Sequence, residues 1–274
     1  MNYQKRVLAY IDILGFSKEI EKTINKDKEY PERIENIHNY FLKAQDLLKV
    51  NNSEVNSEII KKFKVNHFSD SIVISYMENE EAGVFYLIIY ILYICVTALK
   101  NKYLFRGAVV CGKLYHKENI IFGPALVKAS NMEKEFANYP RIVLDDCILE
   151  LLEKYSSIIN SKTELIKIIK KLINRDFDGV YYINYFDGIN YIVGDEVGLK
   201  FYFSSINSIL SEMKKKNKDF KIKSKYLWLK EKYNETLSKY KNKYSNKNNK
   251  LKFPELNKYL EKCKFHFNEK DKNL

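Results

Sequence analysis

The chain has 274 residues, with 47 lysines and arginines against 35 aspartates and glutamates, which gives a formal net charge of +12. Hydrophobic residues make up 46% of the sequence, enough to bury a core and to exclude a disordered chain. Four cysteines without CxxC spacing and only four histidines argue against a disulfide framework and a zinc ribbon. The N-terminal charges, Lys5 and Arg6, lie within the first six residues, and the apolar run after them is cut by Asp12. This is a poor secretory signal, so we expect a cytoplasmic protein.

The first third of the chain mixes strand-like and helix-like patterns. Residues 5–12 are typical of a short buried strand, and residues 30–50 have the spacing of an amphipathic helix. Residues 61–68 and 71–76 predict a β-hairpin with Asp70 at or beside the turn.

The uncharged run at residues 82–99 just reaches the length of a membrane span. Its tyrosines lie in the middle of the run, so we predict a buried helix and no membrane span. Residues 104–112 and 113–122 then predict a second hairpin. A helix at 124–137, with proline in its first turn, and a short strand at 142–144 follow.

The order β-α-β-β-α-β predicts an α+β fold with a ferredoxin-like or palm core. We place this core in residues 1–150 and a mostly helical, basic extension in residues 151–274. Within the extension we expect one strand near 180–183 and a loop at 246–250.

Residues 214–250 hold fourteen lysines against three acidic residues. Aromatic residues lie among these lysines, a pattern that could bind a nucleic-acid backbone. Five apolar residues step by three and four, as one buried helical stripe would: Tyr226, Leu229, Tyr233, Leu237 and Tyr240. We favour the buried stripe and do not expect nucleic acid as a partner.

Two acidic residues stand at the ends of neighbouring elements. Asp12 ends the first strand, just before Gly15, and Asp70 lies at the tip of the next hairpin. If the first and third segments pair, the two carboxylates converge, and such oxygen donors suit Mg²⁺ or Mn²⁺. Turn formation and helix capping are the alternative roles for each aspartate.

Four segments resemble the catalytic domain of class III nucleotidyl cyclases, in order. They are YIDILGF at 10–16, FSDS at 68–71, RGAVVCG at 106–112 and FGPALVKASNME at 122–133. The resemblance implies two Mn²⁺ or Mg²⁺ ions held by Asp12, Asp70 and the Ile13 carbonyl. It also implies substrate contacts from Tyr10 and from the 13–16 backbone: Ile13, Leu14, Gly15 and Phe16.

The implied reaction converts a nucleoside triphosphate to its 3′,5′-cyclic monophosphate and pyrophosphate. The resemblance also implies a homodimer with active sites at the interface. Three positions depart from the family: Val127 and Asn131 replace an Asn/Arg pair, and Ile120 replaces a base-reading Asp. Lys64, six residues before Asp70, stands where the resemblance implies a base-reading lysine.

The segments 122–126, 139–141 and 225–229 are similar to the pyrimidine cyclases of bacterial anti-phage systems. This likeness implies UTP or CTP as substrate and a downstream effector that senses the cyclic nucleotide. Arg106 as a catalytic cation, and Arg141 as a substrate contact, would then replace the missing helix arginine. Structural contacts are the alternative for both arginines.

Two other functions fit the same residues. One is a palm-type enzyme that makes a cyclic di- or oligonucleotide, and the other is a degenerate cyclase-like module that only binds nucleotide or nucleic acid. Among the remaining candidates, we expect either His67 or Phe68 to face the core, His116 to be solvated in a turn, and Cys111 to be a small buried hydrophobe.

Overall fold

The computed structural model describes residues 2–39, 62–99, 102–158, 164–215 and 219–263. The chain forms two compact units, one of residues 1–95 with 103–184 and the other of residues 96–102 with 185–274. The unit with the sheet therefore extends to Asn184, past the boundary we expected at 150, because two strands beyond 150 belong to the same sheet.

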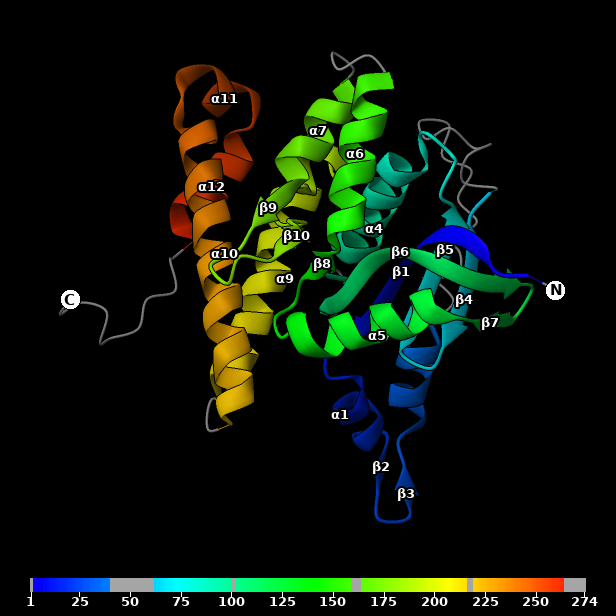
Figure 1. The fold of residues 1–274 in the computed structure, drawn as a ribbon. Coiled ribbons are helices and arrows are strands. Elements are labelled where there is room, and N and C mark those ends of the chain that lie inside the picture. The colour runs from blue at the N-terminus through cyan, green and yellow to red at the C-terminus, as the bar shows by residue number, and fades with distance from the viewer. Residues whose placement is uncertain (1, 40–61, 100–101, 159–163, 216–218, 264–274) are drawn as a thin grey trace. The chain divides into compact units, whose positions relative to one another are not determined.

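The main sheet of the first unit has the order β4-β5-β1-β6-β8-β10-β9, with β7 paired to β6 (Figure 1). Its strands are β1 (Gln4–Ile13), β4 (Lys64–Phe68), β5 (Ser71–Met77), β6 (Phe105–Lys117), β7 (Ile120–Phe122), β8 (Ile142–Leu144), β9 (Ile173–Arg175) and β10 (Tyr181–Ile183). The first four in the order β4-β5-β1-β6 form the expected ferredoxin-like arrangement. The predicted hairpin around Asp70 and the antiparallel pairing of β1 with β5 are confirmed.

Short elements complete the first unit: α1 (Phe16–Glu21), β2 (Ile24–Asn25), β3 (Lys28–Glu29), α6 (Asp146–Ile158) and α7 (Glu164–Leu172). Of the helix expected at 30–50, residues 31–39 are helical, Tyr30 comes before the helix, and residues 40–50 lie outside the described residues. The same holds for the frayed end expected at 268–274.

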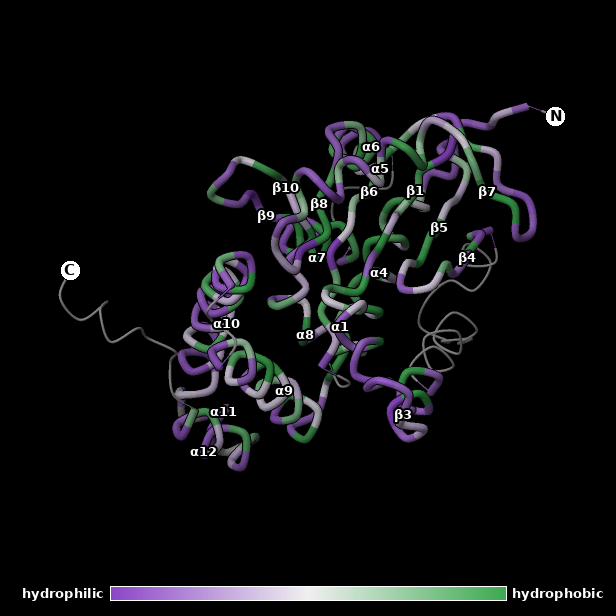
Figure 2. Tube along the Cα trace, turned by 90° about the horizontal axis from the view of Figure 1, so that it is seen from below, coloured by the Kyte–Doolittle hydropathy of each residue, from purple (hydrophilic) through white to green (hydrophobic). Residues whose placement is uncertain are grey.

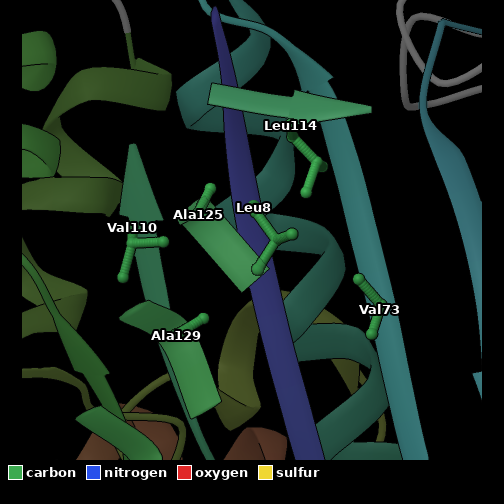
Figure 3. Packing of buried hydrophobic residues seen from close by; sticks show 6 residues of the cluster. All are labelled: Leu8, Val73, Val110, Leu114, Ala125 and Ala129. Carbon is green, nitrogen blue, oxygen red and sulfur yellow. The ribbon is translucent and has the colours of Figure 1, made fainter. Parts of the chain in front are cut away.

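Helix α5 (Pro124–Phe136) packs on the face of the sheet that carries Leu8, and Val7 and Ala9 point to the opposite face. The cluster between α5 and the sheet consists of Leu8, Val73, Val110 and Leu114 from the strands with Ala125 and Ala129 from the helix (Figure 3). Helix α4 (Gly83–Leu99) begins against the ring of Tyr76, which lies on the opposite face. Its uncharged run is almost wholly buried, as predicted. No helix among the described residues is long and apolar enough to cross a membrane.

The second predicted hairpin is wrong in its turn. Strand β6 continues through Gly112 to Lys117, and the chain reverses at Glu118, where φ is 52°. At Gly112 an added Cβ would lie 3.2 Å from the Cβ of Ala125, so the glycine lets α5 approach the strand and does not form a turn. Strand β9 was not predicted, since only Ile173 of its three residues is apolar, whereas the equally short β8 and β10 are β-branched, apolar or aromatic throughout.

A disulfide joins Cys111 of β6 to Cys147 at the start of α6, with 6.1 Å between their Cα atoms. Cys111 is therefore cross-linked, and the expectation that it is a small buried hydrophobe is wrong. No CxxC spacing indicates this pair, because its members are 36 residues apart and meet only through the fold.

The second unit is helical, with α8 (Ile189–Ile192), α9 (Glu196–Lys215), α10 (Phe220–Ser245), α11 (Lys247–Lys252) and α12 (Pro254–Lys262). The predicted stripe of α10 is confirmed, since all five of its residues are buried. Hydrophilic and hydrophobic segments accordingly alternate along α10 (Figure 2). The loop expected at 246–250 is wrong, because the Asn246 side chain caps α11 by accepting from the Asn249 amide.

Candidate active site

Asp12 and Asp70 meet at one end of the central strands. In the sheet register Asp12 lies opposite Ser71 of β5 and opposite Arg106 of β6. The amide of Ile13 donates to the carbonyl oxygen of Asp70 at 3.1 Å, which fixes the hairpin turn beside the end of β1. The fold thus brings together two aspartates that are 58 positions apart, as their sequence context predicted.

Two consecutive hydrogen bonds, through the Ser71 hydroxyl, connect Tyr10 to Asp12. The Tyr10 hydroxyl and the Ser71 hydroxyl are 2.9 Å apart, and the Ser71 hydroxyl donates to the Asp12 carboxylate at 3.5 Å. Alternation along β1 puts both Tyr10 and Asp12 on the face that α5 covers. Tyr10 therefore lies beside the acidic pair, where we expected a substrate contact.

Arg106 is shared between two carboxylates. Its Nε donates to Oδ2 of Asp12 at 3.0 Å and lies 2.7 Å from Oε1 of Glu133 on α5. The Glu133 side chain is only 3% exposed. Since one guanidinium serves both acids, it can move from one carboxylate to the other without being left unpaired.

The pKa of Asp12 is raised to about 6. Burial is the largest cause; Arg106 acts in the opposite direction, and the charges of Asp70 and Glu133 raise the pKa further. Burial therefore dominates the shift, and the two neighbouring carboxylates offset part of the attraction of Arg106. An added cation would favour the charged form of Asp12.

The bend after β1 is built on Gly15, whose φ of 81° favours glycine. The amides of Ile13 and Leu14 donate to the carbonyls of Asp70 and Leu104, so the expectation that these two amides bind phosphate is wrong. The Gly15 amide donates to none of the described residues, and it remains the candidate phosphate donor of the bend. The ring of Phe16 is buried in the core.

The oxygen atoms at this end of the sheet are of the kind that binds a divalent cation. Asp12, Asp70 and the Ile13 carbonyl offer hard oxygen atoms, which Mg²⁺ and Mn²⁺ prefer. No three histidine, cysteine, aspartate or glutamate side chains converge as a metal centre within the described ranges, so two carboxylates and a carbonyl would have to suffice. Binding also requires Arg106 to release Oδ2 of Asp12, and Glu133 offers it a second partner.

Lys64 does not join this site. Its Nζ donates to the carbonyl of His116 at 2.5 Å, and β4 pairs it with Ser75, four residues along β5 from Ser71. At 3.3 Å per residue this is about 13 Å from the level of Asp12.

His116 is buried, so the expectation of a solvated turn residue is wrong. Its Nδ1 lies 2.7 Å from the Ser75 hydroxyl and its Nε2 lies 2.5 Å from Oδ1 of Asn66. Of the pair His67 and Phe68, the histidine turns inward, since its ring nitrogens are buried while Phe68 is exposed.

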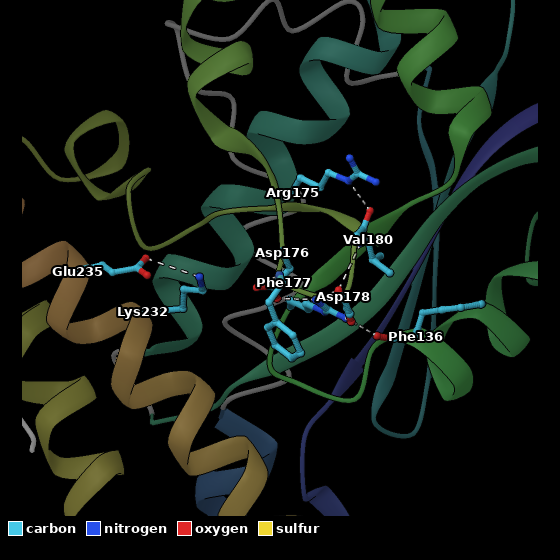
Figure 4. Close-up of polar contacts among 10 residues, drawn as sticks. Phe136, Arg175, Asp176, Phe177, Asp178, Val180, Lys232 and Glu235 are labelled. Atoms are coloured by element: carbon cyan, nitrogen blue, oxygen red, sulfur yellow. Dashed lines mark hydrogen bonds and ion pairs between the residues drawn. The ribbon is translucent and has the colours of Figure 1, made fainter. Parts of the chain in front are cut away.

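Arg141 is fully buried, and its terminal nitrogens pair with Asp176 and Asp178 on the β9–β10 turn. Its Nη2 also donates to the carbonyl of Phe136. Figure 4 labels three of the partners of Arg141, namely Phe136, Asp176 and Asp178. Arg141 is thus a structural contact, the alternative given above, and we do not propose it as a substrate residue.

Glu133 is the residue of this site to which the sequence analysis gave no role. It follows Ala125 and Ala129 at intervals of four on the buried stripe of α5. An acidic residue at a core position of an amphipathic helix needs a partner, and that position was the available signal.

No protein-family description matches the chain, and neither does any curated protein. Among solved structures, the chain is similar to the monomeric guanylyl cyclase domain of the RhoGC fusion protein from the aquatic fungus Blastocladiella emersonii. The identity is 12%, with 67% of this chain and 96% of that chain covered and a TM-score of 0.45.

It is also similar to the catalytic core of a rhodopsin-guanylyl cyclase with converted specificity, in complex with ATPαS. The identity is 15%, with 56% of this chain and 83% of that chain covered and a TM-score of 0.40. A third similar structure is the adenylate/guanylate cyclase/hydrolase from Silicibacter pomeroyi, at 12% identity, 67% and 96% coverage and a TM-score of 0.35. At these values the likeness carries no argument about activity.

Proposed function

We propose that this protein is a divalent-metal-dependent nucleotide cyclase. The observation that carries the proposal is the meeting of Asp12 and Asp70 at one end of the sheet, tied together by the bond from the Ile13 amide to the Asp70 carbonyl. The cyclase-like segment at 10–16 provides one of these acids and the segment at 68–71 provides the other.

In the proposed reaction the ribose 3′-oxygen attacks the α-phosphorus, loses its proton, and displaces pyrophosphate. Bound divalent cations would lower the pKa of the attacking hydroxyl and neutralise charge on the leaving group. Asp12, Asp70 and the Ile13 carbonyl would hold them. Arg106, once paired with Glu133, would place positive charge beside the α-phosphate as negative charge develops there.

The chain's departures from the usual cyclase pattern support a pyrimidine triphosphate, UTP or CTP, as substrate. Ile120 on β7 stands where the resemblance implies a base-reading aspartate, and its apolar side chain cannot hydrogen-bond to a purine. We further propose a homodimer with shared active sites and a role as a second-messenger synthase in anti-phage defence, which follows from the resemblance of segments 122–126 and 139–141.

A module that binds nucleotide without turnover is the second candidate. The ion pair between Arg106 and Asp12 favours it, because an arginine that stayed on Asp12 would keep metal away. Nucleotide binding without product would support this second function.

The test incubates the purified full chain with each nucleoside triphosphate and Mn²⁺ and analyses products by mass spectrometry. A cyclic mononucleotide from UTP or CTP, lost in Asp70→Asn, supports the proposal. A product containing two or more linked nucleosides would identify the palm-type alternative. The absence of every product from the wild-type protein would overturn the cyclase proposal.

A further inference from the structure

The connection between α9 and α10 is the most strongly basic part of the chain. Residues 214–225 contain seven lysines and one acidic residue, Asp219. The Asp219 side chain caps α10 by accepting from the Lys221 amide, so this acid is already engaged.

Four lysines of this connection are exposed and make no ion pair with any described residue: Lys214, Lys215, Lys221 and Lys223. Some lysines elsewhere in the same unit have acidic partners, as in Lys239 with Asp187 and Lys250 with Glu261. Lys258 and Lys262 of α12 are also exposed without an ion pair to a described residue, but residues 214–223 hold four such lysines within ten positions.

Phe220 lies among these lysines and is 82% exposed. The matching case in the first unit is Phe177, which is 72% exposed but stands between Asp176 and Asp178. An exposed apolar ring with lysines on both sides of it in the sequence suits the boundary between headgroups and acyl chains of an anionic bilayer, whereas a ring between two acids does not.

We propose that the α9–α10 tip, defined as Lys214, Lys215, Phe220, Lys221 and Lys223, docks on an anionic membrane surface. The ring of Phe220 enters the interfacial region while the four ammonium groups meet lipid phosphates. This docking goes beyond the proposed cyclase function and does not depend on it.

The buried state of the other aromatic residues favours lipid over single-stranded nucleic acid. Tyr226, Trp228, Tyr233 and Tyr240 of α10 all face the core, so Phe220 has no exposed aromatic neighbour on the same helix. Proteins that bind single strands stack successive bases on several exposed rings, and this helix offers one.

The test is co-sedimentation of the full chain with vesicles of pure phosphatidylcholine or of phosphatidylcholine with about a third phosphatidylglycerol. We expect binding only to the anionic vesicles, weakened at least about tenfold when the four lysines are changed to glutamine and about fivefold in Phe220→Ser. Phe177→Ser and the glutamine variant of Lys5, Lys134, Lys170 and Lys171 make matched changes elsewhere and should bind as the wild type does.

Equal loss in the matched variants, or no binding by the wild type, would overturn the proposal. So would a wild-type protein that ignores anionic vesicles but binds single-stranded RNA through the same tip. Circular dichroism of each variant confirms that lost binding does not reflect an unfolded second unit.

Discussion

On the face of the sheet beneath α5, the residues around one end of strand β1 are basic and those around its other end are acidic. The basic end consists of Arg6, Lys64 and His116, and the acidic end consists of Asp12, Asp70 and Glu133 with Arg106. Leu8 and Tyr10 separate the two ends along β1. Burial is not the main difference between the two ends. The difference is whether the polar side chains find partners that balance their hydrogen bonds and charges.

At the basic end the polar groups are satisfied by neutral partners. Arg6 donates to the side chain and carbonyl of Ser75 and to Gln4, and both ring nitrogens of His116 have partners. At the acidic end one arginine serves two carboxylates, and a third carboxylate lies close enough to raise the pKa of Asp12. A satisfied network stabilises a fold, whereas an unbalanced one can accept a ligand.

The largest effect should come from Asp70→Asn at the acidic end. We expect cyclase activity to fall on the order of a thousandfold, equivalent to about 4 kcal/mol of transition-state stabilisation, because one of two cation-holding carboxylates is lost. Product formation is measured with UTP or CTP and Mn²⁺. Asp27→Asn, an exposed change in the β2–β3 turn, is the control. If Asp70→Asn kept full activity, the acidic end would not be the catalytic end of the strand.

The basic end should instead control stability through pH. Burial, with Arg6 and Lys64 adding to it, lowers the pKa of His116 from 6.5 to about 4. Between these values the unfolded chain binds the proton and the folded chain does not. The free energy of unfolding therefore falls as the pH drops from about 6.5 to about 4, by up to about 3 kcal/mol.

Urea unfolding of the wild type and His116→Gln across this range measures the effect. Asp12 has a raised pKa and gives a slope of the opposite sign in both proteins, so the difference between them isolates His116. If the free energy of unfolding changed with pH equally in the variant and the wild type, His116 in the folded protein would bind its proton as readily as in the unfolded chain.

A smaller effect should follow from Glu133→Gln. Without this charge Arg106 pairs with Asp12 alone, so Mn²⁺ must compete with a tighter ion pair, and we expect its affinity to fall by about five- to tenfold. Calorimetric titration with Mn²⁺ measures this change. Glu135→Gln, on the exposed side of α5, removes the same charge and should leave the affinity unchanged. Equal affinities in both variants would limit Glu133 to a packing role.

The local parts of the acidic end could be predicted from the sequence, and the long-range parts could not. A strand that ends in Asp12 and a hairpin turn at Asp70 are short patterns, and the pairing of β1 with β5 follows from them. The partners of Arg106 and Arg141 depend on which helix and which turn cover each guanidinium. Strand β9, which leads into the turn that holds Arg141, has one apolar residue followed by Asn174 and Arg175, so its sequence does not indicate a strand.

The role of Glu133 was missed for a similar reason. Its position on the buried stripe of α5 was visible in the sequence, but its partner was not, since Arg106 lies 27 residues earlier on another strand. The second hairpin differs from the prediction because its strands were divided between Gly112 and Lys113, whereas β6 runs on to Lys117 and α5 packs closely against Gly112.

The most direct test of the central claim is a titration of the full chain with Mn²⁺ alone, in which bound ion is followed by electron paramagnetic resonance. If Asp12 and Asp70 hold a cation together, the wild type shows saturable binding, and Asp12→Asn and Asp70→Asn each abolish it while the protein stays folded. Saturable binding that persists in both variants, or none in the wild type, would contradict the account.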